Sequence, residues 1–220
     1  MSGWAHGIEF SEVGTDDVGL FYGWVGEEGS LEIRPRYRTA CCKRCGKLDP
    51  RSAAKLGFDG DLWRKPPRKD LFATWDLQIV ASDRAVKAFD RCFPGAIDRW
   101  ALCSGWSFVM PRNLVFPHAR MNQAGDIKPA FWDGMDRCPK CRRWAHASID
   151  EKRVLLPDGE RVIGYWGESD DCACPNVSWV CDDASLTFLR AQKLIGMRLQ
   201  RNEYGPGAKS FRDVFGAANG

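Results

Sequence analysis

The chain of 220 residues is long enough for one fairly large domain or two small ones, and its hydrophobic content of 44% is ordinary for a globular protein. Its net charge of +3, with both signs interspersed, is too small to predict a nucleic-acid partner. No apolar run approaches the roughly 18 residues needed to span a membrane. Because the start, MSGWAHGIEF, also lacks the features of a signal peptide, we expect a cytoplasmic protein with no membrane partner.

The first elements expected along the chain are short strands. Within residues 1–38, the segments GIEFSEV, LFYGWVG and SLEIRPRY read as strands with glycine turns between them. RKPPRKD at 64–70 predicts a loop, and KRVLLPDGERVIGYWG at 152–167 predicts a hairpin around residues 157–159. The C-terminal segment, YGPGAKSFRDVFGAANG, predicts a short helical turn and a loose tail.

A strand followed by a capped helix is predicted twice, at residues 75–95 and 176–196. The two segments, WDLQIVASDRAVKAFDRCFPG and NVSWVCDDASLTFLRAQKLIG, align so that Ile79 meets Trp179. Each has a short apolar stretch, then Ser or Asp as N-cap, then an amphipathic helix. The expected apolar faces are Ala85, Val86 and Phe89 in the first helix, and Leu186, Leu189 and Leu194 in the second. Gly95 and Gly196 stand where glycines that end a helix are expected.

A CxxC pair precedes each of these units. The pairs are Cys42-Lys-Arg-Cys45 and Cys138-Pro-Lys-Cys141. Because the pair, a variable segment, the strand and the helix recur in the same order, we predict an internal duplication with pseudo-repeats at about 39–100 and 135–200. The expected fold is a single α+β domain over residues 1–220, in which the paired cysteines join two strand–helix units.

The two CxxC pairs are typical of a structural zinc site. A tight turn places both sulfurs of a pair on one side, and two such turns supply the tetrahedron that Zn²⁺ prefers. We therefore predict Cys42, Cys45, Cys138 and Cys141 as zinc ligands. Four protein sulfurs leave no open position for water, so the zinc would be structural and would clasp the two halves of the chain.

Each CxxC pair, considered alone, has alternatives to metal binding. A CxxC can be a redox couple or half of a set of disulfides, although cysteine clusters in the reducing cytosol more often bind metal or do redox chemistry. Neither pair follows a strand and opens a helix, as a thioredoxin-like redox motif does. The neighbouring Cys41 is expected to point away from the sulfurs of Cys42 and Cys45.

The remaining cysteines divide into two groups. Cys92, Cys103 and Cys181 are expected to be buried as small apolar groups. Cys172-Ala-Cys174 is either part of a plain loop or, with His146, a second metal site.

No catalytic motif stands out, so we expect a protein that is not an enzyme. The chain has no Walker-type phosphate loop, no GxGxxG after a strand and no HExxH. CSGWSF is not a nucleophile elbow, and the HxE half of the zinc-deaminase signature is missing. His6, His118 and His146 stand far apart in the sequence, and an isolated histidine is more often structural than catalytic.

Basic residues flank both cysteine pairs, in RPRYRTACCKRC and CPKCRRW. This pattern gives an alternative function, a zinc-ribbon protein that binds nucleic acid, although the small net charge argues against such a partner. The residues that would gather near one metal are Arg34, Arg36, Arg38, Lys43, Arg44, Lys140, Arg142 and Arg143.

The order CxxCG, DLFATWDLQIVASDRAVKAF, CPxC and LTFLRAQKL resembles the double-CxxCG motif family of bacterial toxin–immunity systems. The resemblance runs from about residue 39 to residue 199 and departs from the family at Arg142, where the family has glycine. It implies that Cys42, Cys45, Cys138 and Cys141 bind metal. It also implies a cytoplasmic immunity protein that binds one cognate toxin and blocks it, and it does not indicate the contact surface.

Overall fold

The computed structural model describes residues 6–11, 19–25, 30–58, 68–76, 78–103, 105–112, 120–121, 127–128, 140–141, 161, 163–166 and 178–200. These residues mix strands and helices, as expected of an α+β chain. Of the helices in these ranges, none has the length and apolar composition that crossing a membrane requires. The turn predicted at 157–159 and the C-terminal segment lie outside the described residues.

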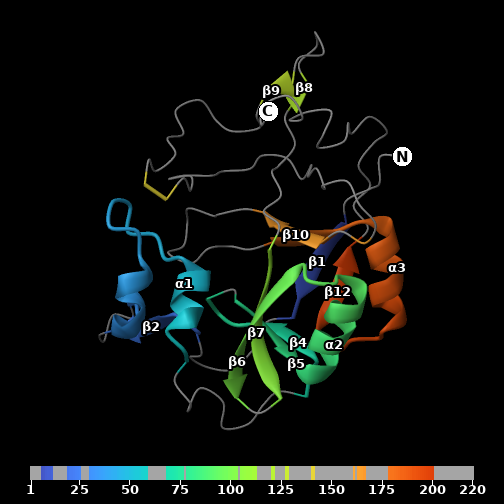
Figure 1. Cartoon of the computed structure of the whole chain (residues 1–220), viewed down its shortest axis with the longest axis horizontal. Helices are drawn as coiled ribbons and strands as arrows, with labels where there is room; N and C mark the ends of the chain where they lie inside the picture. Colours follow the sequence, from blue (N-terminus) through green and yellow to red (C-terminus); the bar gives the residue numbers. More distant parts are fainter. Residues whose placement is uncertain are drawn as a thin grey trace.

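The middle of the chain forms a four-stranded sheet with one helix, which we call the first unit (Figure 1). The sheet order is β4-β5-β7-β6, and all neighbouring strands are antiparallel. The helix α2 connects β5 to β6. The elements are β4 (Leu71–Ala73), β5 (Ile79–Ser82), α2 (Asp83–Cys92), β6 (Ile97–Cys103) and β7 (Trp106–Pro111).

The two ends of the described chain form a second four-stranded sheet, which with its helix is the second unit. Its order is β10-β11-β1-β12, again antiparallel throughout, and α3 connects β11 to β12. The two sheet orders are equivalent when β1 takes the place of β7, so an N-terminal strand completes the C-terminal sheet. The elements are β1 (His6–Phe10), β10 (Ile163–Trp166), β11 (Ser178–Cys181), α3 (Asp183–Ala191) and β12 (Met197–Gln200).

The two predicted strand–cap–helix segments are both present. The Ser82 hydroxyl accepts a hydrogen bond from the Ala85 N–H at 3.3 Å, and the Asp182 carboxylate accepts one from the Ser185 N–H at 3.0 Å. Each therefore satisfies a backbone donor that the first turn of its helix leaves without an intrahelical partner. The predicted helical face is wrong at Leu194, because α3 ends at Ala191, although the Leu194 side chain is buried in the same core.

Neither glycine that was expected to end a helix does so. α2 ends at Cys92 and α3 at Ala191, and both glycines lie in the turns that follow. Gly95 has φ +69° in open space, whereas Gly196 has φ +97° and lies against the backbone of the other unit. A Cβ at Gly196 would fall 1.8 Å from the Leu71 carbonyl oxygen, so this position requires glycine for close approach.

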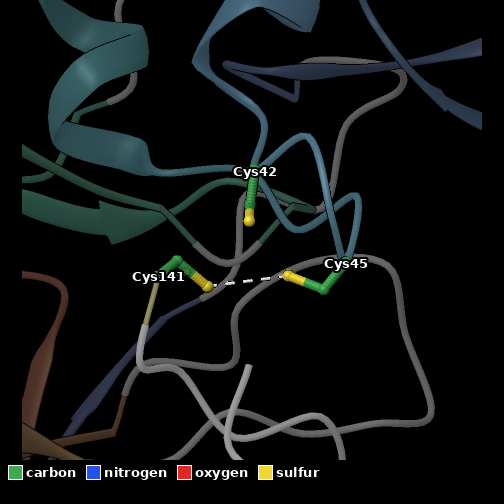
Figure 2. A group of neighbouring side chains, drawn as sticks. All are labelled: Cys42, Cys45 and Cys141. Atoms are coloured by element: carbon green, nitrogen blue, oxygen red, sulfur yellow. Dashed lines mark hydrogen bonds between the residues drawn. The ribbon is translucent and has the colours of Figure 1, made fainter. Parts of the chain in front are cut away.

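The segment between β1 and the first unit covers that unit's outer face. It contains the predicted N-terminal strands β2 (Tyr22–Val25) and β3 (Ser30–Ile33), which pair as a hairpin. A 3₁₀ helix, η1 (Pro35–Ala40), replaces the end of the third predicted strand, because Pro35 begins a turn of helix there. A loop that carries Cys42 and Cys45 (Figure 2) leads from η1 to the helix α1 (Pro50–Lys55). A separate short pair is formed by β8 (Arg120–Met121) and β9 (Ile127–Lys128).

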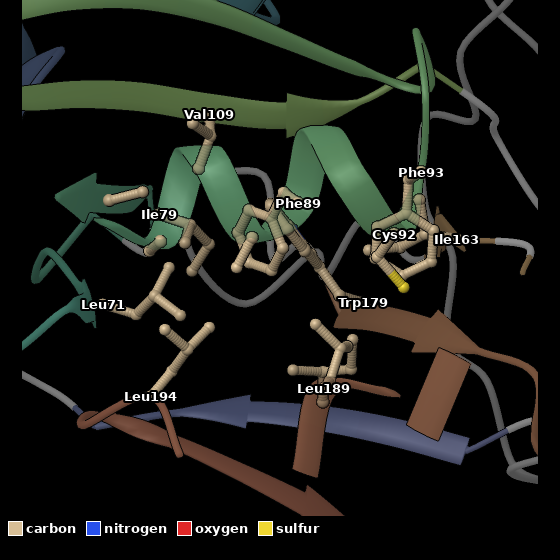
Figure 3. Packing of buried hydrophobic residues seen from close by; sticks show 14 of the residues in the cluster. Leu71, Ile79, Phe89, Cys92, Phe93, Val109, Ile163, Trp179, Leu189 and Leu194 are labelled. Carbon is tan, nitrogen blue, oxygen red and sulfur yellow. The ribbon is translucent and has the colours of Figure 1, made fainter. Parts of the chain in front are cut away.

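Two hydrophobic cores lie on the two faces of the first sheet. On β4 and β5 the residues are buried in alternation: Ile79 and Ala81 face the helices, while Val80 faces the hairpin cover. The inner core joins both units, and Figure 3 shows side chains of α2, such as Phe89, packed near Trp179 of β11. The outer core contains Leu20, Phe21, Tyr37, Leu48, Ala53, Phe72 and Phe108.

A buried carboxylate fastens the two units together. The Asp70 carboxylate accepts hydrogen bonds from the Arg84 guanidinium at 2.6 Å and from the Ile195 N–H at 2.9 Å. Arg84 also donates to the carbonyl oxygen of Gln192 at 2.9 Å, just beyond the end of α3. The start of β4 and of α2 in the first unit is thereby tied to the turn after α3 in the second.

Candidate metal centre

The loop with Cys42 and Cys45 is held as a tight hairpin between two short helices. The Cys42 N–H donates to the Lys47 carbonyl oxygen at 2.9 Å, and the Gly46 N–H donates to the Cys42 carbonyl oxygen at 2.8 Å. Gly46 has φ +73°, the left-handed conformation that turns the chain back after the second cysteine. The closing pair, Cys41 and Leu48, forms a β-bridge. The sequence CxxCG therefore folds as the tight turn that was predicted.

The base of this hairpin is anchored in the outer core. Leu48 is buried beside the equally buried Tyr37, whose hydroxyl donates to the Gly57 carbonyl oxygen at 3.1 Å. On the far side of the hairpin, Asp49 begins α1 and accepts a hydrogen bond from the Arg51 N–H at 3.3 Å. Because η1 and α1 hold both ends, the cysteine turn has a fixed position on the first unit.

Three cysteine sulfurs meet at this turn, as Figure 2 shows. The sulfurs of Cys42, Cys45 and Cys141 all lie within 4.8 Å of one another, and all three residues are half-buried. The Cys45 and Cys141 sulfurs are 3.6 Å apart although 96 positions separate them in the chain. Three of the four predicted ligands are thus brought together from two distant segments.

One distance between these sulfurs is close to the edge length of a tetrahedral metal site. Bonds of about 2.3 Å to zinc place the sulfurs of a tetrahedral site about 3.8 Å apart. The separation of 3.6 Å between Cys45 and Cys141 is close to that edge length. It is also far longer than the bond of about 2.05 Å that would join the sulfurs of a disulfide. The cluster can therefore hold a thiophilic metal ion such as Zn²⁺ without rearrangement of these two sulfurs.

Cys41 takes no part in the sulfur cluster, in agreement with the sequence-based expectation. Its Sγ lies 3.7 Å from the Tyr37 carbonyl oxygen in η1, to which it donates. The Cys41 thiol, one position before Cys42, is therefore hydrogen-bonded to η1.

The cysteines that were predicted to be buried differ in exposure. Cys92 and Cys181 are fully buried in the inner core, where burial raises the pKa of Cys92 to about 11 and that of Cys181 further. Both thiols therefore stay protonated near neutral pH, as expected of inert core groups. Cys103 is only half-buried, contrary to the prediction, because it ends β6 at an irregular step in the pairing with β7.

The other cysteine predictions fall outside the described residues. Cys138, the fourth predicted zinc ligand, lies there, and so do His146, Cys172 and Cys174 of the second candidate site. Arg142, at which the second motif departs from CxxCG, also lies there.

A groove opens beside the cysteine turn that no sequence motif indicated. It has a volume of about 490 Å³, and β2, β3, η1 and the turn itself provide its walls. An exposed ion pair between Arg38 and Glu32, at 3.2 Å, lies in its wall. These residues carry no shared motif, because they meet only when the β2–β3 hairpin packs beside the cysteine turn. The lining residues are Tyr22, Glu32, Ile33, Arg38, Cys45, Gly46 and Lys47.

Comparison of the chain with protein-family models, with curated proteins and with solved structures found no match.

Proposed function

We propose that the chain is a non-catalytic immunity protein that binds one cognate bacterial toxin and blocks the toxin's active site or substrate path. The observation that carries this proposal is the meeting of Cys42 and Cys45 with Cys141. A double-CxxCG protein requires its two distant motifs to converge, and these three sulfurs do so. The proposal places the protein in the cytoplasm, where its thiols stay reduced and available to metal.

The metal assigned to the cluster is a structural zinc ion with Cys42, Cys45, Cys138 and Cys141 as ligands. Three of these sulfurs are already within reach of a common centre. The fourth, Cys138, precedes Cys141 by the same three positions that separate Cys42 from Cys45. A site with four thiolates holds the chain together and does no chemistry on a substrate.

The two units are assigned to an internal duplication, and the strand registers support this. Leu71 pairs with Ala81 in the first sheet, and Ile163 pairs with Cys181 in the second. On β7, the partners of Val80 and Ile97 are Phe108 and Pro111, three positions apart, and on β1 the partners of Val180 and Met197 are Gly7 and Phe10, again three positions apart. A common strand–helix motif does not require equal register across the matching strands or equal capping positions. Their agreement therefore supports a duplication.

The structure weakens the support for the alternative, a zinc-ribbon protein that binds nucleic acid. Three of the eight basic residues on which it depends are engaged within the chain. The Arg34 and Arg36 guanidinium groups donate to backbone carbonyl oxygens, and Arg38 pairs with a glutamate. Arginines that support loops in this way have fewer donors left for phosphates.

Co-expression with toxins encoded beside this gene tests the proposed function. Cells that express the cognate toxin should survive when they also express this protein, and the two proteins should purify as a complex. Cys141→Ser should reduce protection because it opens the clasp, whereas the matched neighbour variant Cys41→Ser should protect as well as the wild type. A protein that binds none of the neighbouring toxins and protects no cell would rule the proposal out.

A further inference from the structure

We propose that the basic residues around the cysteine cluster, with the adjoining groove, form the surface that binds an acidic segment of the partner protein. We define the basic rim as Lys43, Arg44 and Lys140, together with Lys47 in the groove wall. The inference rests on the proposed function in treating the partner as a protein, and it adds the contact surface and the chemistry of the partner's segment.

The cluster brings the basic rim together from two distant parts of the chain. Lys43 and Arg44 lie between Cys42 and Cys45, and Lys140 immediately precedes Cys141. Because the Cys45 and Cys141 sulfurs are 3.6 Å apart, the attached segments 43–44 and 140 must lie around one centre. Lys43, Arg44 and Lys140 are all exposed, so their charges are accessible to solvent near the cluster.

The groove beside the cluster offers space and contacts for part of a peptide. Its wall combines the cations Arg38 and Lys47 with Ile33 of β3, and the Cys45–Gly46 turn forms one edge. A volume of about 490 Å³ is sufficient for a few side chains, within the range of small ligand sites. Carboxylates can reach the rim cations while an apolar side chain of the same segment lies against Ile33.

Two features favour a protein segment over nucleic acid. Glu32, whose side chain is 49% exposed, lies in the groove wall and would repel a phosphate backbone that carries a charge at every nucleotide. A peptide can instead place its carboxylates away from Glu32. The aromatic residue of the groove, Tyr22, is only 1% exposed and therefore offers no face on which a base could stack.

The test is a binding titration with fluorescent probes and zinc-loaded full-length protein. The probes are a labelled peptide of alternating glutamate and leucine, its counterpart of alternating lysine and leucine, and a labelled oligothymidine. We expect the glutamate peptide to bind most tightly and to weaken as salt is raised. The variant Lys43→Glu, Arg44→Glu, Lys140→Glu should bind it about tenfold more weakly, since three exposed charge pairs become repulsive.

The matched control variant has the same change in charge, placed on and beside the helices that pack on the inner core. Lys87 on α2, Arg190 on α3 and Lys193 in the turn after α3 are all exposed, and their replacement by glutamate should leave binding of the peptide within about twofold of wild type. Zinc content and the circular dichroism spectrum, measured for both variants, establish that each is folded. The neutral variant Lys43→Gln, Arg44→Gln, Lys140→Gln should give an intermediate loss.

Three results would overturn the inference. One is an equal loss of peptide binding in the rim and control variants, which would show that the loss comes from the net charge of the protein and not from the rim. Another is oligothymidine binding that matches the peptide and depends on the same residues, which would make this a nucleic-acid surface. The last is no binding of the glutamate peptide. Failure of the proposed function would look different, since it would leave the peptide titration intact while toxin protection is absent.

Discussion

The two four-stranded units share a backbone plan and differ in the residues that form one row across the middle of each sheet. In the first unit, Phe72, Val80 and Phe108 form a row across the sheet and are buried under the β2–β3 hairpin, η1 and α1. In the second unit, Gly164 and Gly7 take the places of the two phenylalanines on either side of Val180. The comparison teaches that both units keep the same strand pairing and helix-cap positions although the residues in this row differ in size.

The inner faces of the two units place their large residues on different elements. At matching positions the first unit has Ile79 on its strand and Phe89 on its helix, and the second has Trp179 and Leu189. The large residue is therefore on the helix in one unit and on the strand in the other. Phe89 and Trp179 meet with their ring centroids 5.9 Å apart, so the two large residues pack against each other in the shared core.

The largest loss of stability from a single substitution is expected at Gly196, and a much smaller one at Gly95, its counterpart after the other helix. Gly196→Ala places a Cβ on the Leu71 carbonyl oxygen and also strains a backbone at φ +97°, so we expect a loss of about 3–5 kcal/mol in the free energy of unfolding. Gly95→Ala strains φ alone, in open space, and should cost about 1 kcal/mol. Urea unfolding of both variants measures the difference, and equal losses would contradict the close joint between the units.

The stability of the fold is expected to depend on pH through Asp76, which binds residues 21 and 22 to the first sheet. Asp76 lies in the turn between β4 and β5 and accepts hydrogen bonds from the N–H groups of Phe21 and Tyr22 at 2.8 and 3.3 Å. Complete burial raises the pKa of Asp76 above its ordinary value of 3.8, and these hydrogen bonds, with one from Thr74, only partly oppose the shift. The native state therefore binds this proton more tightly than the unfolded chain does.

The sign of the resulting pH dependence follows from that difference. Below pH 3.8 the carboxyl is protonated in both states, and its contribution to stability is fully present. As the pH rises through the raised native pKa, the unfolded chain has already lost its proton and that contribution disappears. Asp76→Asn keeps an acceptor oxygen but cannot ionise. The wild type should thus lose stability relative to Asp76→Asn as pH rises, and a difference between their urea midpoints that is constant with pH would contradict this assignment.

The smallest effects concern the helix caps and test how alike the two units are. Ser82→Ala and Asp182→Ala each remove an acceptor for a first-turn N–H and should each cost about 1 kcal/mol. Each cap residue makes one further hydrogen bond, because Asp182 accepts from the Arg161 N–H at 3.1 Å and the Ser82 hydroxyl donates to the Asp70 carboxylate at 3.3 Å, so the two losses should be similar. Thermal unfolding measures both, and a negligible effect of either variant would show that the caps do not define the units.

The sequence was most informative where the signal was local. Ser82 and Asp182 mark helix starts, and CxxCG at Cys42 marks a tight turn, because a cap or a turn needs only neighbouring residues. The place of β1 in the second sheet could not be predicted, since strand pairing over such distances depends on the whole fold. The same is true of Asp70 with Arg84 and of the groove wall at Glu32. Each depends on segments that meet only in three dimensions.

Metal analysis of the purified protein tests the central claim, a zinc ion that clasps two distant segments, most directly. The wild type purified without added metal should contain one zinc ion per chain, and Cys141→Ser should lose it, whereas Cys41→Ser should keep it because that thiol bonds within η1. A wild-type protein without zinc, or a Cys41→Ser variant that loses as much zinc as Cys141→Ser, would contradict the account.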